Sequence, residues 1–162
     1  MKPVPGLPIE QQPDNVVLAM LLCGEARGEG IDGMNAVAQS IMNRLKRPLH
    51  FGATIKDICL KPWQYSCFNA NDPNRAKMLD FWHTDPASYA MAEQVVVAAT
   101  AGALADTVGP ATHYVTDAIW NHDDSDHIAA GHPPRWYSKQ CLESGITKET
   151  AHIGHQHFAV TP

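Results

Sequence analysis

The chain has 162 residues, of which 44% are hydrophobic, so it is long enough to bury one sizeable core without metal or disulfide support. It carries 12 basic and 17 acidic side chains, a net charge of −5, and its basic residues do not cluster with aromatic ones, which argues against a nucleic-acid-binding surface. The four cysteines have no CxxC spacing and two of them lie in apolar runs, so we expect reduced thiols in the core.

The beginning of the chain predicts an extended arm, residues 1–13, followed by one folded domain, residues 14–162. The arm is rich in proline and lacks the continuous apolar stretch of an export signal, so we expect a protein made in a cytoplasm. Residues 16–23 are all apolar, a run too short to cross a membrane but long enough for a core helix. Asp14, which follows a proline, is the expected N-cap of that helix.

Directly after this apolar run, residues 23–30 (CGEARGEG) place two carboxylates four positions apart among three glycines. We interpret Glu25 as an acid at the edge of the core that faces a cleft. A carboxyl group in such a place is partly removed from water, which favours the protonated form that a general acid needs. The alternative is that Glu25 and Glu29 are solvated and pair with Arg27 or Lys46 around the end of a helix.

A second helix is predicted beyond this turn. Asp32 can cap it, the apolar positions of residues 34–45 recur at helical spacing, and Pro48 marks its end. Residues 50–72 lack helical periodicity and hold Trp63, Tyr65 and Phe68 among polar residues, which predicts a short strand or hairpin.

Two Asp-Pro pairs, at residues 72–73 and 85–86, each place a capping residue before a proline at the first helical position. They predict helices over about residues 74–82 and 86–104. From Gly109 onward the chain is rich in loops, with three groups of histidines.

Four groups of residues are candidates for chemistry: the Glu25 turn, residues 64–69 (QYSCFN), residues 109–114 (GPATHY) and residues 153–158 (IGHQHF). The second group mixes amide, hydroxyl and aromatic side chains. This mixture suits a sugar, because aromatic faces pack on pyranose rings while amides bind hydroxyl and acetamido groups. The alternative is that the second and third groups are edge strands with half-buried aromatic residues.

Together and in this order, the four groups resemble the SleB-like cell wall hydrolases, the family of spore cortex-lytic enzymes and related phage lysins. The resemblance covers about residues 14–160, and its strongest element is residues 24–29 followed by a helix that ends in Asn-Arg at 43–44. Residues 61–69 (KPWQYSCFN) are similar to the family's next block. Where the family usually has a histidine two residues after the closing glycine, this chain has Gln156.

The resemblance implies an α+β fold, mostly helical and lysozyme-like with a small β element, that cleaves peptidoglycan between N-acetylmuramic acid and N-acetylglucosamine. Glu25 would protonate the oxygen of this bond. In a lytic transglycosylase, which we favour, the same carboxylate then takes the proton of the muramyl C6 hydroxyl, so no second protein carboxylate is needed. The alternative is a hydrolytic muramidase, in which Glu29 or an aspartate activates water.

Further expectations follow from the residues and the resemblance together. Arg27 and Glu29 would hold the turn around Glu25. We expect no metal and no cofactor, peptidoglycan as the partner, a monomer, and no nucleic acid or stable membrane insertion. The setting would be a phage endolysin that reaches the wall through a holin, or an enzyme of the virion. The implied substrate-binding residues are Gln64, Ser66, Asn69, His113 and Tyr114.

Two alternatives belong to other classes. A zinc-dependent wall hydrolase could use the histidines and carboxylates of residues 120–127 and 152–157, although there is no HExxH motif and neither stretch has a known ligand spacing. A non-catalytic wall-binding module could use the aromatic residues of 64–69 without Glu25.

Overall fold

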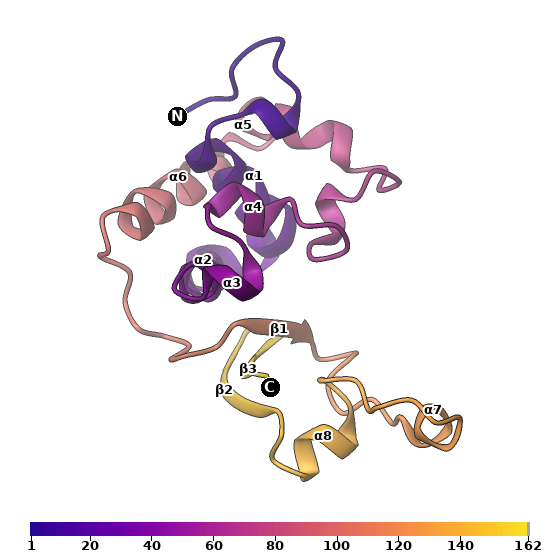
Figure 1. The fold of residues 1–162 in the computed structure, drawn as a ribbon. Coiled ribbons are helices and arrows are strands. Elements are labelled where there is room, and N and C mark those ends of the chain that lie inside the picture. Colours follow the sequence, from indigo (N-terminus) through magenta and orange to yellow (C-terminus); the bar gives the residue numbers. More distant parts are fainter. Residues whose placement is uncertain (162) are drawn as a thin grey trace. The chain divides into compact units, whose positions relative to one another are not determined.

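A computed structural model describes residues 1–161. The structure is mostly helical and contains a three-stranded antiparallel sheet, which confirms the predicted α+β class (Figure 1). Contacts within the chain define two compact units, one of residues 1–106 and one from Thr107 onward. Among the described residues, no helix has the length and apolar character needed to span a membrane.

The regular secondary structure of the first unit is all helical. Its helices, including four short 3₁₀ helices labelled η, are η1 (Ile9–Gln11), α1 (Asp14–Ala26), η2 (Arg27–Glu29), α2 (Gly30–Leu45), α3 (Pro48–Phe51), α4 (Ile55–Cys59), η3 (Ser66–Phe68), η4 (Arg75–Asp80), α5 (Phe81–Thr84) and α6 (Pro86–Thr100).

Helix α1 forms the centre of this unit. Every residue from 16 to 23 is buried, and the helix packs against α2, α4 and α6. A helix that is apolar all round can be stable only when it is surrounded in this way. The predicted core helix is therefore confirmed.

The predicted caps of the first two helices are wrong. Helix α1 already begins at Asp14, because Pro13 has an extended backbone and its carbonyl accepts the first amide bonds of the helix. Helix α2 begins at Gly30, whose positive φ of 65° turns the chain, so Asp32 lies within the first turn. A carboxylate there still interacts favourably with the helix dipole.

The predicted strand or hairpin over residues 50–72 is also wrong, since this segment contains α4 and η3. Thr54 begins α4 with a capping box: its hydroxyl oxygen accepts from the backbone N–H of Asp57 at 3.0 Å, and the Asp57 carboxylate accepts from the N–H of Thr54 at 3.0 Å. These bonds satisfy amides that the start of a helix leaves unpaired.

The helices expected after the two Asp-Pro pairs are present in altered form. In place of the helix predicted over about residues 74–82, the structure has η4 followed by α5. The second is α6, in which Asp85 caps by accepting from the N–H of Ser88 at 3.2 Å. Helix α6 ends at Thr100, a few residues before the predicted end.

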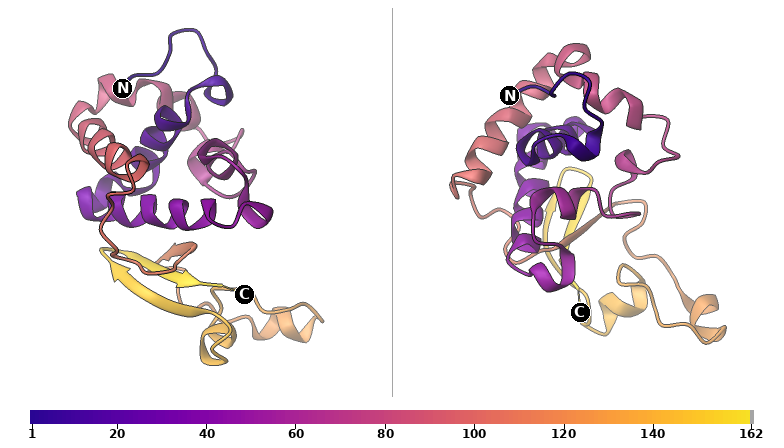
Figure 2. Two further views of the ribbon diagram at one scale, coloured as in Figure 1. Left: turned by 60° about the vertical axis from the view of Figure 1, so that its left-hand side comes forward. Right: turned by 45° about the horizontal axis from the view of Figure 1, so that its top comes forward.

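The second unit holds the sheet and two short helices. The strands have the spatial order β1-β3-β2 and are antiparallel, as the two views of Figure 2 allow the reader to follow. Phe158 and Ala159 of the central strand are fully buried. The elements are β1 (His113–Thr116), α7 (Ser125–Ala129), α8 (Lys139–Glu143), β2 (Lys148–Ile153) and β3 (Gln156–Val160).

Candidate active site

Glu25 lies in the last turn of α1, where its side chain is half-buried. The preceding residue is Gly24, and a Cβ atom there would lie 2.9 Å from Cys67 Sγ and 2.9 Å from Met78 Cε. These separations are too short for any side chain. The missing side chain of Gly24 therefore lets the segment of Cys67 lie directly against the end of α1.

Cys67, a residue of this segment, contacts Glu25. Its backbone N–H donates to Glu25 Oε1 at 3.5 Å, a long hydrogen bond, and its thiol also interacts with this carboxyl group. Burial raises the pKa of the Cys67 thiol, and the negative charge of Glu25 raises it further. Cys67 is therefore a protonated thiol that can donate to the Glu25 carboxylate.

A buried arginine supports the same segment. Arg44 is 2% exposed, and its Nη1 donates to the hydroxyl of Tyr65 at 2.9 Å. In the amide orientation that satisfies its neighbours, the oxygen of Gln64 accepts from both Nη atoms of Arg44, at 3.0 and 3.1 Å. Burial raises the pKa of Tyr65; Arg44 opposes this rise and the charge of Glu25 adds to it. Gln64, predicted to bind substrate, is thus anchored to the interior.

Ser66 and Asn69, the other two predicted substrate-binding residues of this unit, lie close to Gln64 in the sequence. Ser66 is exposed, and Asn69 is half-buried with its Oδ1 accepting from the N–H of Trp63 at 3.2 Å. Trp63 has a positive φ of 65°, and it is 79% exposed. A non-glycine residue rarely adopts such a backbone unless its surroundings hold it there.

Trp63 lines a groove of about 510 Å³ in the first unit. Asn69 and Asn71 contribute amides to its wall, and Glu10 and Arg75 contribute charges. An aromatic face beside amides is the combination that binds a sugar ring. Sequence reasoning placed Trp63 in the right segment but did not select it, because its exposure depends on a backbone conformation that the sequence does not reveal.

The two residues predicted to support the turn lie where the helix breaks. Helix α1 ends at Ala26 and is followed by η2, so Glu25 and Glu29 are not on one continuous helix. The guanidinium of Arg27 lies 4.9 Å from the centre of the Phe81 ring. Glu29 covers Gly33, where an added Cβ would come within 2.2 Å of the Glu29 Cβ. Both contacts favour a positioning role in the turn.

His113 and Tyr114, the remaining predicted substrate residues, lie on the edge strand β1 of the second unit. His113 Nδ1 lies 3.0 Å from the Thr112 hydroxyl oxygen and 3.1 Å from that of Thr161. Tyr114 packs on Phe158 with ring centres 5.4 Å apart. Their contact with substrate stays a prediction.

Two aspartates of the loop after β1 hold that loop together. Asp124 is 1% exposed; its Oδ2 accepts from the backbone N–H of Arg135 at 2.6 Å, and its Oδ1 pairs with the Arg135 guanidinium. Burial alone would raise the pKa of Asp124, but the bonds from Arg135 outweigh it and hold this pKa below its ordinary value. Hydrogen bonds from the side chain and backbone of Ser125, and then from Gln140, lower the pKa of Asp123 from 3.8 to about 2.

We expect the second unit to lose stability in acid. Both carboxyl groups have a lower pKa when folded than when unfolded, so their contribution is complete above about pH 4 and is lost as the pH falls toward about 2. Thermal unfolding followed between about pH 5 and about pH 2 measures this. Asp123→Asn removes one of the titrating groups and should reduce the pH dependence. An Asp123→Asn variant with the full acid sensitivity of the wild type would contradict the assignment.

The described residues contain one group suited to a metal ion, formed by Asp117, His152 and His157 of the second unit. In the first unit, by contrast, a half-buried acid lies beside a segment of amides and aromatic residues. That arrangement is typical of an enzyme that cleaves glycosidic bonds by proton transfer.

Comparison with protein families shows a broader class of enzyme. The family model described as Cell Wall Hydrolase matches residues 28–159. The chain belongs to this family, which confirms the SleB-like resemblance and identifies the chain as a cell wall hydrolase that acts on peptidoglycan. The match includes residues 64–69 and begins three residues after Glu25, so the role of Glu25 rests on its own motif and geometry. Searches of curated proteins and of solved structures found no match to the chain.

Proposed function

We propose that this cell wall hydrolase cleaves the glycan strands of peptidoglycan between N-acetylmuramic acid and N-acetylglucosamine, with Glu25 as the general acid. The observation that carries the proposal is the half-buried Glu25 carboxyl at the end of α1, held by Cys67. A carboxyl so positioned can donate its proton to the bond oxygen as positive charge develops on the sugar.

We favour a lytic transglycosylase over a hydrolytic muramidase. In the transglycosylase the nucleophile is the C6 hydroxyl of the substrate, so Glu25 can perform both proton transfers. Of the four aspartates that could otherwise activate water, Asp117, Asp123, Asp124 and Asp126, three are held by neighbours in their own unit: Asp117 by histidines, Asp123 by Ser125, and Asp124 by Arg135. These contacts support the route that needs one protein carboxylate.

Within this proposal the setting is host lysis by a bacteriophage. The enzyme would be made in the host cytoplasm, pass the membrane through a holin, and act on the wall as a monomer. The support for this setting is the resemblance to a family that includes phage lysins.

A digest of purified peptidoglycan, analysed by mass spectrometry, tests the reaction. We expect muropeptides that end in 1,6-anhydromuramic acid, are one water lighter than hydrolysis products and do not react with borohydride. Reducing muramic ends would contradict the transglycosylase and identify a muramidase. Cleaved peptide cross-links with intact glycan would contradict both.

A chelator separates proton-transfer chemistry from metal catalysis. Because Glu25 supplies the proton, EDTA should leave the cleavage rate unchanged when the assay runs well below the unfolding temperature. Complete loss of cleavage that returns with zinc would instead support the zinc-dependent hydrolase.

A further inference from the structure

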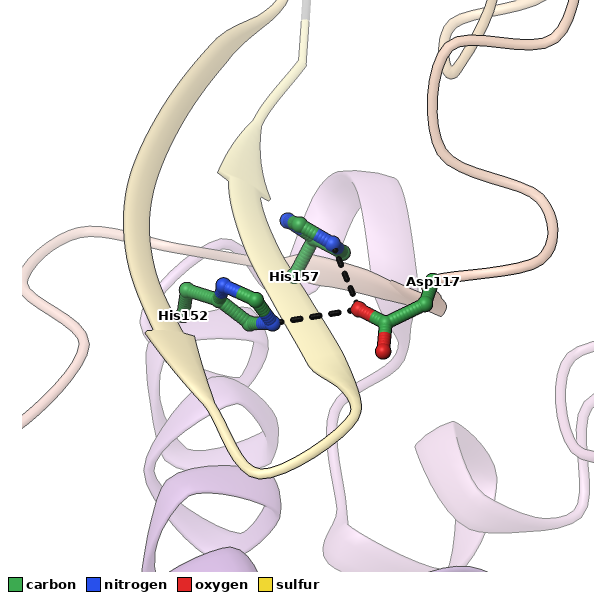
Figure 3. Close-up of side chains that lie close together, drawn as sticks. All are labelled: Asp117, His152 and His157. Atoms are coloured by element: carbon green, nitrogen blue, oxygen red, sulfur yellow. Dashed lines mark hydrogen bonds and ion pairs between the residues drawn. The ribbon is translucent and has the colours of Figure 1, made fainter.

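Two histidines face each other across the hairpin of the second unit (Figure 3). His152 of β2 and His157 of β3 are direct partners in the strand register, and their rings stack with centres 3.9 Å apart. Asp117 directly follows β1, the strand on the other side of β3, and its backbone N–H donates to the carbonyl of His155 at 3.0 Å. Sheet pairing thus brings three segments to one point.

The side-chain atoms at this point are of the kinds that bind metal ions, and they lie close together. Asp117 Oδ1 lies 3.1 Å from His152 Nε2 and 2.8 Å from His157 Nε2, and the three ligand atoms lie within 4.8 Å of one another. Two ligands bound tetrahedrally to zinc at about 2 Å are themselves about 3.3 Å apart. The two separations from Asp117 are therefore close to those between zinc ligands, and a small outward movement of the carboxylate would make room for the ion.

The surroundings orient these ligands. His157 Nδ1 lies 2.8 Å from a Glu149 carboxylate oxygen, so when a metal ion takes the place of the proton on Nε2, Glu149 can accept the proton on Nδ1 and fix the orientation of the ring. His155 Nδ1 lies 3.0 Å from the other oxygen of Asp117. The indole of Trp120 stacks on His157 with ring centres 4.8 Å apart, so that the side chain of His157 is only 12% exposed.

Access to the cluster remains open. The side chains of Asp117 and His152 are each 48% exposed, so an ion could enter from solvent and keep a water molecule as a further ligand. Two imidazoles and one carboxylate are a ligand set that zinc accepts.

We propose that Asp117, His152 and His157 bind one zinc ion, which ties the β2–β3 hairpin to the segment after β1. This site is additional to the glycan-cleaving function, and none of its residues is assigned to that chemistry.

Titration of the metal-free full chain with zinc chloride, followed by calorimetry, tests the site. We expect one zinc per chain and a rise of several degrees in the unfolding temperature at saturating zinc. His152→Ala should weaken zinc binding at least 100-fold. Glu149→Gln, which keeps all three ligands, should weaken it by about 10- to 100-fold.

A second pair of histidines provides the control. His127 and His132 stack with ring centres 4.7 Å apart in the same unit but lie outside the metal cluster. Zinc binding should be unchanged when both are replaced by alanine. Equal losses in this control and in His152→Ala, or a wild type that binds zinc no more tightly than His152→Ala, would overturn the proposal.

Cobalt provides a second readout, which can be made on the wild type and therefore does not depend on whether a ligand variant folds. Cobalt bound to the wild type should give the intense visible absorption of a tetrahedral site, and Glu149→Gln should reduce its affinity in parallel with that of zinc. A wild-type cobalt spectrum identical to that of the hydrated ion would contradict the site. These binding readouts are independent of peptidoglycan cleavage, so either proposal can fail without the other.

Discussion

Replacing Glu25 with glutamine should slow peptidoglycan cleavage by about 10²- to 10⁴-fold. The amide keeps the volume of the side chain and can still accept the Cys67 N–H, but it has no proton to give to the glycosidic oxygen. The unfolding temperature should therefore stay close to that of the wild type. The measurement is the rate of muropeptide release by purified protein, with circular dichroism to verify the fold.

Two variants serve as controls for Glu25→Gln. Glu29→Gln makes the same chemical change four positions away and should affect cleavage much less, because Glu29 packs on Gly33 in the turn. Glu25→Asp keeps the acid but withdraws it by one methylene, and a displacement of about 1 Å can cost 10²-fold in rate. Wild-type activity in folded Glu25→Gln would disprove the assignment.

Replacing Arg44 with methionine should lower the free energy of unfolding of the first unit by about 3 kcal/mol. Methionine fills similar space but leaves the Tyr65 hydroxyl and the Gln64 carbonyl without their donor. A bond to a charged group contributes about 1.5 to 3 kcal/mol, and Arg44 makes such bonds to both Tyr65 and Gln64. For a unit of this size such a loss corresponds to a fall of more than 10 °C in the unfolding temperature.

Denaturant unfolding of Arg44→Met and Arg47→Met measures this effect. Arg47 follows α2 on the exposed surface, and its replacement should change stability by less than about 0.5 kcal/mol. Similar stability losses in the two variants would show that the buried guanidinium does not support the segment of residues 64–67.

The long helices were predictable from the sequence because each has several consistent signals. Residues 16–23 are uniformly apolar, residues 34–45 repeat at helical spacing, and Asp85-Pro86 marks the start of α6. Helix α4 and η3 were missed because each spans too few residues to show a period. Thr54 and Asp57, which form the capping box, were a usable signal for α4.

The candidate site was predictable only in part. Its motif and chemistry indicated Glu25 and the segment of residues 64–69, and the structure brings these together through Cys67 and Gly24. The anchoring of Gln64 by Arg44 could not be predicted, because it depends on the packing of α2 against that segment.

The zinc cluster shows a different limit of sequence reasoning. The linear spacing of the histidines in residues 152–157 matches no known motif, so the sequence by itself does not favour a metal site there. His152 and His157 meet through the strand register, and Asp117 reaches them from beyond a third strand. Neither the strand pairing of the two histidines nor the approach of Asp117 can be read from the spacing of these residues in the sequence.

The four cysteines have a practical consequence for spectroscopy. All are unpaired and buried, and burial raises the pKa of Cys23 to about 12 and raises that of Cys59 as well. Alkylating reagents attack thiolates, so these native thiols should react slowly. A cysteine introduced at a surface position would then be labelled selectively in an otherwise unmodified background. One such label on each unit would allow the distance between the two units to be followed during wall digestion.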